Sequence, residues 1–227
     1  PTLMTRFSRL VLASSLLAPF SLSEAASLEQ VLAAMNKSAP SFRDMSARLT
    51  RVEHTAVIND TSRAAGVVRM KRTGKEVRLL IEFTEPDPVT VAFEKATARR
   101  YYPKIQTVQV FDLGKHRSLV DQFLLLGFGT SGVELARSYA IKAGGEESVG
   151  GAATTRLELL PKTAGVKEHL SRAELWVTAE GYPLQQKFYF PSGDYTLVTY
   201  QELRLNADLP DAAFRLSLPK GVKIEYP

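Results

Sequence analysis

The chain has 227 residues, of which 44% are hydrophobic and 23% charged, and its net charge is +5 at pH 7. These proportions belong to an ordinary globular protein and exclude disordered, collagen-like and coiled-coil chains. With no cysteine, the chain has no disulfide scaffold, thiolate metal site or cysteine nucleophile, and we expect no lipid-modified N-terminal cysteine. The mild positive charge is compatible with an anionic partner but does not require one.

Residues 1–25 have the pattern of a secretory signal, apart from the three residues that precede Met4. Two arginines are followed by a mostly apolar run, Leu10 to Leu22, and small side chains at Ser23 and Ala25 precede a cleavage point at Ala25/Ala26. The run is shorter than the roughly 20 apolar residues that span a bilayer. We therefore expect export to the periplasm with removal of this segment.

The remaining chain, residues 26–227, is expected to form a single domain. It opens with Ser27-Leu28-Glu29-Gln30, a capping box that predicts the start of a helix. Apolar residues then recur at helical spacing from Leu28 to Met35, and Pro40 ends the pattern. We expect a short amphipathic helix there.

From Phe42 onward the apolar residues alternate with polar ones, as in antiparallel strands with one buried face. Turn sequences such as Glu180-Gly181 separate the alternating segments, and no linker or long repeat divides them. We therefore predict an α+β, mainly antiparallel fold, with roughly ten strands in one sheet. A sheet of that size curls, and its concave apolar face has to be filled by side chains, helices or a ligand.

The segment from His116 to Phe128 interrupts the alternation. It is apolar most of the way round by Leu126 and ends at Gly127 and Gly129, which is unusual for a surface helix. One interpretation is a buried helix that plugs the hollow of the sheet; the other is a plug that a ligand displaces. A second short helical turn is expected over Val133 to Tyr139.

Sequence motifs give no positive sign of catalysis. The three histidines are far apart and have no metal ligand at helical spacing, and no catalytic or phosphate-binding signature occurs. We expect no enzyme activity, no metal and no cofactor, although a Ser-His-Asp triad is not excluded by the sequence. Tyr101 and Tyr102, with basic neighbours, suggest nucleic-acid stacking, but strand alternation and export both argue against a nucleic-acid partner. Trp176 is either a packing residue at an edge or an exposed contact.

The order of these pieces resembles the LolA-type outer-membrane lipoprotein carriers. The resemblance covers nearly the whole chain after residue 26, although each motif alone is weak. Its most specific part is the closing Asp-Ala-Ala-Phe-Arg-Leu of residues 211–216. The stretches that support it are 28–32, 68–72, 101–103, 159–162, 173–177, 181–184 and 211–222.

The resemblance implies a strongly curved, incomplete and half-open β-barrel, with helices that plug or lid its concave face. It also implies a monomeric periplasmic carrier that takes lipoprotein acyl chains or other lipids from an inner-membrane release complex to an outer-membrane acceptor, with transient membrane contact. Arg72 corresponds to a residue that holds the lid by donating hydrogen bonds to backbone carbonyls. The chain departs from the family after this residue. In the carriers a proline follows the arginine, and an aromatic residue comes four positions after it. Here Thr73 and Gly74 follow Arg72, and the fourth position is Glu76.

A lipid or lipoprotein carrier is therefore the leading hypothesis. A periplasmic sensor or adaptor that binds a regulatory partner on the same scaffold is the alternative. An enzyme that uses the hollow as a substrate pocket is a third hypothesis, but no recognisable group of catalytic residues supports it. The apolar side chains expected to line the hollow are Leu79, Ile81, Phe83, Val91, Phe93, Leu119, Phe123, Leu126, Leu175, Phe188 and Phe190.

Overall fold

The structure is a computed structural model, and it describes residues 27–74, 76–114, 120 and 123–227. The expected signal segment, residues 1–25, lies outside the described residues. The described chain forms a twelve-stranded, mainly antiparallel sheet with a few short helices. Its strands are β1 (Asp44–Thr55), β2 (Asp60–Thr73), β3 (Glu76–Glu85), β4 (Val89–Glu94), β5 (Thr97–Tyr102), β6 (Thr107–Asp112), β7 (Tyr139–Val149), β8 (Ala152–Pro161), β9 (Arg172–Val177), β10 (Pro183–Tyr189), β11 (Tyr195–Leu205) and β12 (Lys223–Glu225). The helices are α1 (Leu28–Ser38), α3 (Gly132–Ser138) and α4 (Ala164–Lys167), with 3-10 turns η1 (Ala39–Ser41), η2 (Ala56–Ile58), η3 (Pro103–Ile105) and η5 (Asp211–Phe214).

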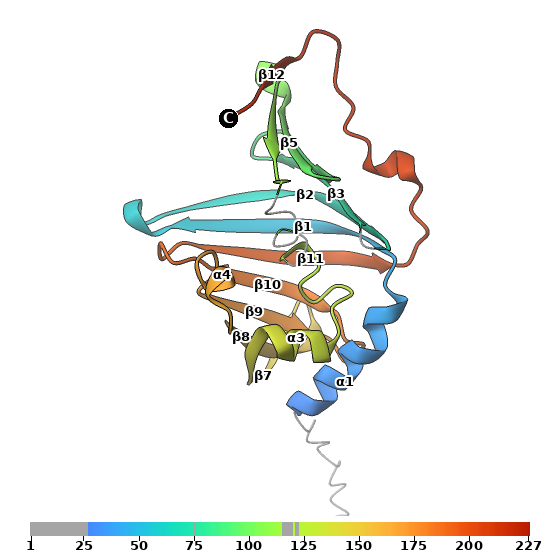
Figure 1. Cartoon of the computed structure of the whole chain (residues 1–227), viewed down its shortest axis with the longest axis vertical. Helices are drawn as coiled ribbons and strands as arrows, with labels where there is room; N and C mark the ends of the chain where they lie inside the picture. The colour runs from blue at the N-terminus through green and yellow to red at the C-terminus, as the bar shows by residue number, and fades with distance from the viewer. Residues whose placement is uncertain (1–26, 75, 115–119, 121–122) are drawn as a thin grey trace, which may run out of the picture.

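The sheet consists of two meanders that meet in its middle. Strands β1 to β6 follow one another outward in one direction, and β11 back to β7 extend in the other (Figure 1). The two halves join where β1 pairs with β11 in antiparallel fashion, from Met45 opposite Leu205 to His54 opposite Tyr195. The sequence predicted roughly ten strands. The difference includes β12, a three-residue strand parallel to β6, which is too short to show an alternating pattern.

The opening helix is confirmed with its capping box. The hydroxyl of Ser27 accepts a hydrogen bond from the Gln30 backbone N–H at 3.2 Å, and the Ser27 backbone N–H donates to the Gln30 side chain at 2.7 Å. The helix ends at Ser38, two residues before Pro40, as proline requires. The expected second helical turn is α3, which has its own capping box at Ser131.

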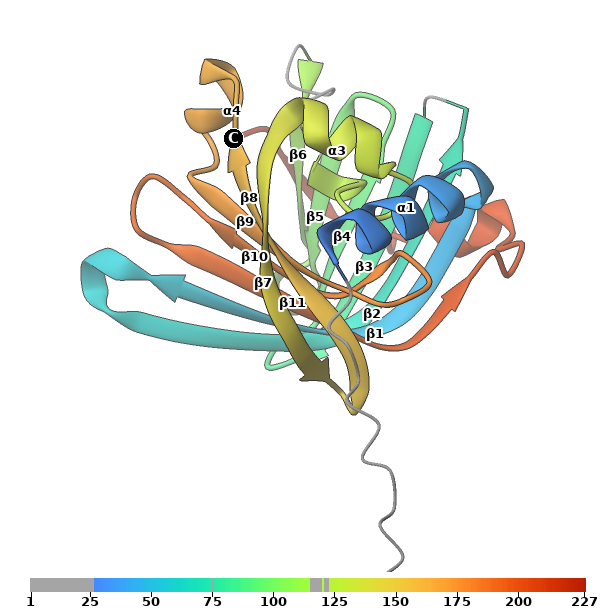
Figure 2. The ribbon, with the colours of Figure 1, turned by 90° about the horizontal axis from the view of Figure 1, so that it is seen from below.

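Figure 2 shows that the sheet curves around α1 and α3, which lie on its concave side. The sheet is not closed into a barrel: in the described chain its two edge strands are β12 and β7. The expected incomplete, half-open barrel is confirmed. Because side chains alternate between the two faces of a strand, the apolar set of each strand turns toward these helices.

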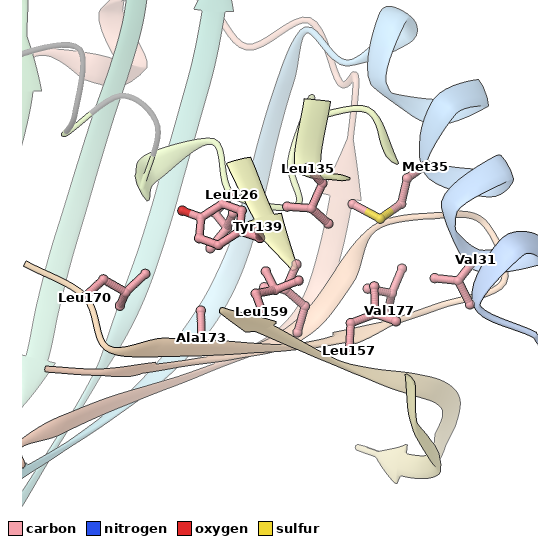
Figure 3. Packing of buried hydrophobic residues seen from close by; sticks show 11 residues of the cluster. Val31, Met35, Leu126, Leu135, Tyr139, Leu157, Leu159, Leu170, Ala173 and Val177 are labelled. Carbon is pink, nitrogen blue, oxygen red and sulfur yellow. The ribbon is translucent and has the colours of Figure 1, made fainter. Parts of the chain in front are cut away.

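Two apolar clusters fill the concave side. One joins α1 and α3 to strands β7–β9 (Figure 3), where Val31 and Met35 of α1 point toward the strands. The other lies over β1–β3 around Phe128. Gly181 brings its turn against the backbone of α1: a Cβ there would lie 2.5 Å from the carbonyl of Ala34.

The convex side is partly covered as well. The carboxylate of Asp211, in η5, pairs with Lys71 at 2.9 Å and with Arg78 at 3.4 Å, which ties the C-terminal segment to β2 and β3. Trp176 is buried, and its indole N–H donates to Glu147 at 2.6 Å. Trp176 is therefore a packing residue of the convex side.

Candidate ligand-binding hollow

A hollow of about 260 Å³ lies in the concave face, between the two apolar clusters. Strands β1, β2 and β3 form one wall, strands β10 and β11 the other, and Phe123 and Leu124 close one side. The hollow therefore spans the seam where the two meanders meet. Its lining consists of Met45, Leu49, Arg51, Val68, Met70, Leu79, Ile81, Phe83, Phe123, Leu124, Leu170, Gln186, Phe188, Phe190, Thr196, Val198 and Tyr200.

Six of the residues expected to line the hollow do so. They come from three parts of the chain, namely β3, the interrupting segment and β10 with the residue after it. These six are Leu79, Ile81, Phe83, Phe123, Phe188 and Phe190. Val91 and Phe93 pack beside the hollow, against the cluster over β1–β3. Leu119 lies outside the described residues.

Leu126 and Leu175 lie elsewhere, in the closed cluster under α1 and α3. Both are less than 2% exposed. The reason is the turn at Gly127, whose positive φ of 82° directs the chain against β9 and β10. A Cβ at this glycine would meet Pro183 at 2.9 Å and Leu175 at 3.4 Å, so the turn packs closely against the strands, and the two leucines are buried in the same cluster.

Arg72 holds the turn after the interrupting segment. Its guanidinium donates to the carbonyl of Gly129 at 2.8 Å and to those of Ala39 and Phe42 at 2.9 Å and 3.1 Å. One acceptor, Gly129, belongs to the turn, and the other two belong to η1 and its C-cap, directly after α1. One side chain of β2 therefore fixes the turn and the segment after α1 against the sheet. Gly129 has φ of 70°, and a Cβ there would lie 2.7 Å from the guanidinium.

A second polar link joins the same segment to the opposite wall. The Gln186 amide N–H donates to the carbonyl of Leu126, and the Tyr200 hydroxyl donates to the Gln186 amide oxygen at 2.6 Å. Burial raises the pKa of Tyr200 above its usual value, so the phenol stays protonated and remains a donor. The ring of Tyr200 packs edge-on against Phe128 at 5.3 Å between centroids.

Arg51 is a lining residue that the sequence reasoning missed. Its guanidinium lies over the ring of Phe83, 4.4 Å from the centroid, and pairs with Glu53 at 3.1 Å. Burial lowers the pKa of Arg51; the charge of Arg100 acts in the same direction, and Glu53 opposes both. The signal was present in the alternation, because Arg51 is two residues from Leu49 and so shares its face.

Two other depressions are more polar in lining. One of about 450 Å³ lies between the end of α1, the 127–129 turn and the turn before Tyr182, and includes the charged Lys37 and Glu180. Another of about 370 Å³ lies between α1 and the β7–β8 hairpin and includes Gln30 and Glu146. The hollow at the seam is the most consistently apolar of the three, which makes it the candidate site.

Across the described ranges, no group of three or more His, Asp or Glu side chains is placed to hold a metal ion. Of the helices in the described part, none has the length and apolar character needed to cross a membrane.

The comparisons with known proteins find similarity in structure only. No model of a known protein family matches the chain, and no curated protein matches it either. An uncharacterized conserved protein from Thermus thermophilus is similar with a TM-score of 0.53 and 12% identity, over 88% of this chain and 98% of that one. MucB is similar with a TM-score of 0.50 and 15% identity, over 83% of this chain and 62% of that one.

A LolA superfamily protein from Nitrosomonas europaea is also similar, with a TM-score of 0.39 and 15% identity, over 85% of this chain and 99% of that one. The likenesses to the Thermus protein and to MucB, at 12% and 15% identity, show a shared fold and nothing finer. The open, curved sheet itself agrees with the half-open barrel that the resemblance in sequence implies.

Proposed function

We propose that the protein is a periplasmic carrier that binds acyl chains of lipoproteins or lipids in the hollow and shuttles them toward the outer membrane. The observation that supports this most is the apolar hollow of about 260 Å³ at the seam. An apolar cavity of about 150 Å³ is already enough to bind benzene, so the hollow has room for part of an acyl chain. Each methylene group that leaves water there contributes about 0.8 kcal/mol.

Arg72 has the lid-holding role in this proposal. A long acyl chain needs more room than the hollow offers, so Phe123 and Leu124, which close one side of it, shift when a long chain is loaded. The turn at residues 127–129 follows them directly in the chain and shifts with them. The three hydrogen bonds from the guanidinium set the resistance to that shift. The carbonyls they satisfy belong to two separate segments, so breaking the contact frees both together.

The rest of the proposal follows from a carrier role. Residues 1–25 direct export and are removed near Ala25/Ala26, and the carrier acts as a monomer, without catalysis or cofactor. An inner-membrane release complex supplies the ligand, an outer-membrane acceptor takes it, and contact with either membrane is transient. The apolar lining residues of β3, β10 and the interrupting segment bind the acyl chain of the ligand.

The test is binding of the fluorescent probe N-phenyl-1-naphthylamine and its displacement by palmitate. Ile81→Trp fills the hollow from β3, whereas Thr84→Trp places the same side chain on the exposed face of the same strand. We expect probe binding by the unaltered protein and by Thr84→Trp, and loss of binding by Ile81→Trp with the fold retained in circular dichroism. Binding that Ile81→Trp leaves unchanged would place the ligand elsewhere, and an unaltered protein that binds neither probe nor palmitate would refute the carrier.

A sensor or adaptor is the second candidate, supported by the similarity to MucB, which has been solved in complex with MucA. A carrier releases a bound lipoprotein to an acceptor, whereas a sensor binds a regulator and delivers nothing. Incubation with spheroplasts measures the first property, since a carrier moves labelled lipoprotein into the medium. Capture of a membrane regulator's periplasmic domain without such release would favour the sensor.

A further inference from the structure

Arg51 places a positive charge in the wall of the hollow. It is the only charged residue in that lining, as far as the described chain shows, and 24% of its side chain is exposed. One face of the guanidinium is covered by Phe83. Its Nε atom is buried and donates to no acceptor among the described residues.

Two charged residues of the described chain act on Arg51, namely Glu53 and Arg100. Glu53 is the partner of Arg51, at 3.1 Å, but 43% of its side chain is exposed. Arg100 lies on the same concave face, since it pairs across β4 and β5 with Val91, which pairs in turn with Ile81 of the lining. Among the described residues, the charges that act on Arg51 are thus one carboxylate and one further guanidinium.

The position of Arg51 gives the hollow a direction. Met45 and Leu49 come before it on β1 and contribute apolar walls near the turn held by Arg72. Arg51 follows them toward η2, at the tip of the β1–β2 hairpin. The lining is thus apolar along β1 and ends in a cation, which is the arrangement that suits an amphiphile.

We propose that the hollow binds an amphiphile with an acyl chain and an oxyanion at its end, and that Arg51 donates hydrogen bonds to that oxyanion. This inference rests on the proposed function. A guanidinium matches the paired oxygens of a carboxylate or a phosphate and binds either of them well. A free fatty acid and a phospholipid headgroup both present this chemistry.

The experiment compares three ligands of similar chain length by displacement of N-phenyl-1-naphthylamine at about pH 8. Palmitate provides a carboxylate, palmitoyl lysophosphatidic acid a phosphate, and hexadecanol neither. Arg51→Met removes the charge but keeps an apolar stem, and Arg51→Lys keeps the charge. Arg48→Met is the matched control, because Arg48 is on the same strand, is 66% exposed and pairs only loosely with Glu202 at 3.6 Å.

We expect the unaltered protein to bind one of the anionic ligands at least about tenfold more tightly than hexadecanol, as one charge-assisted contact provides. In Arg51→Met the affinity for the anionic ligand should fall to about that for hexadecanol, while the affinity for hexadecanol stays unchanged. Arg51→Lys should keep part of the preference for the anionic ligand, and Arg48→Met should keep all of it. A preference for palmitate identifies a carboxylate as the ligand group, and a preference for the lysolipid identifies a phosphate.

Equal binding of all three ligands by the unaltered protein would overturn the anion site and leave the hollow as a general acyl-chain site. A preference that survives in Arg51→Met would also overturn it. Failure to bind any ligand would instead refute the proposed function. If Arg51→Met does not fold, as judged by circular dichroism, Arg51→Gln gives the same comparison, because it removes the charge but keeps a polar group at the end of the side chain.

Discussion

Replacing Arg72 by methionine tests whether this residue holds the turn and the end of α1 against the sheet. The change removes three charge-assisted hydrogen bonds, to Gly129, Ala39 and Phe42, and keeps most of the side-chain length. Hydrogen bonds to charged groups contribute about 1.5–3 kcal/mol each. Because these three share one half-buried guanidinium, we expect a combined loss near the value of one or two such bonds, about 3 kcal/mol.

In a protein of this size, 1 kcal/mol corresponds to roughly 2–4 °C in Tm, so the expected decrease is about 6–12 °C. Urea denaturation measures the free energy of unfolding, and hydrogen exchange of amides 123–132 measures the local effect. Lys71→Met is the control. Lys71 is the preceding residue of β2, but its ammonium donates to the Leu209 carbonyl and to Asp211 on the convex side.

We expect faster exchange at residues 123–132 in Arg72→Met only, while Lys71→Met changes exchange in the C-terminal segment. Equal exchange of the turn in both variants would refute the reasoning. Gly129→Ala disturbs the same contact through the residue that accepts the hydrogen bond, because its Cβ would lie 2.7 Å from the Arg72 guanidinium. Gly150 also has a positive φ, 59° against 70° at Gly129, but a Cβ there would meet nothing within 4 Å. Gly150→Ala therefore measures the backbone strain alone, and Gly129→Ala should be the more destabilising of the two.

Two further predictions concern polar groups. Tyr200→Phe leaves the amide oxygen of Gln186 buried without its donor, and should lower the free energy of unfolding in urea by about 1–3 kcal/mol; adding Gln186→Leu should not double the loss, since both changes disrupt one network. The pKa of Asp211 is lowered chiefly by the hydrogen bond from Lys71. Its stabilising effect is therefore complete above the unfolded-state pKa of about 3.9 and is lost as the pH falls through the lowered folded-state pKa. Asp211→Asn should accordingly be less stable than the unaltered protein at neutral pH, and thermal unfolding should show the difference vanish in acid; a difference that persists at low pH would contradict this.

The sequence predicts which face of a strand a residue occupies, but not how deep it lies. The alternation of Leu79, Ile81 and Phe83 placed all three correctly on the concave side, where they line the hollow. Leu175 has an equally clear alternation and lies in a closed core instead. The difference depends on what packs opposite, which here is the turn at Gly127, and periodicity holds no information about that partner.

The same limit explains why Arg51 was missed. Its inward position follows from its spacing to Leu49, yet a charged residue on an inward face suggests an exposed strand end until a neighbour such as Phe83 is known to cover it. Trp176 is the opposite case. Its hydrogen-bond acceptor, Glu147, is on β7, a strand whose place two positions away from β9 is set by the topology of the sheet.

The central pairing of β1 with β11 has a consequence for how the chain reaches this structure. Each meander consists of neighbours in sequence and can assemble locally, but β1 gains its second neighbour only when Tyr195–Leu205 has been synthesised. Until then, one of the longest strands presents an unpaired edge and an uncovered apolar face, the combination that recruits other chains. Completion of the seam is therefore a late step that competes with aggregation, and the same step brings the two walls of the hollow together.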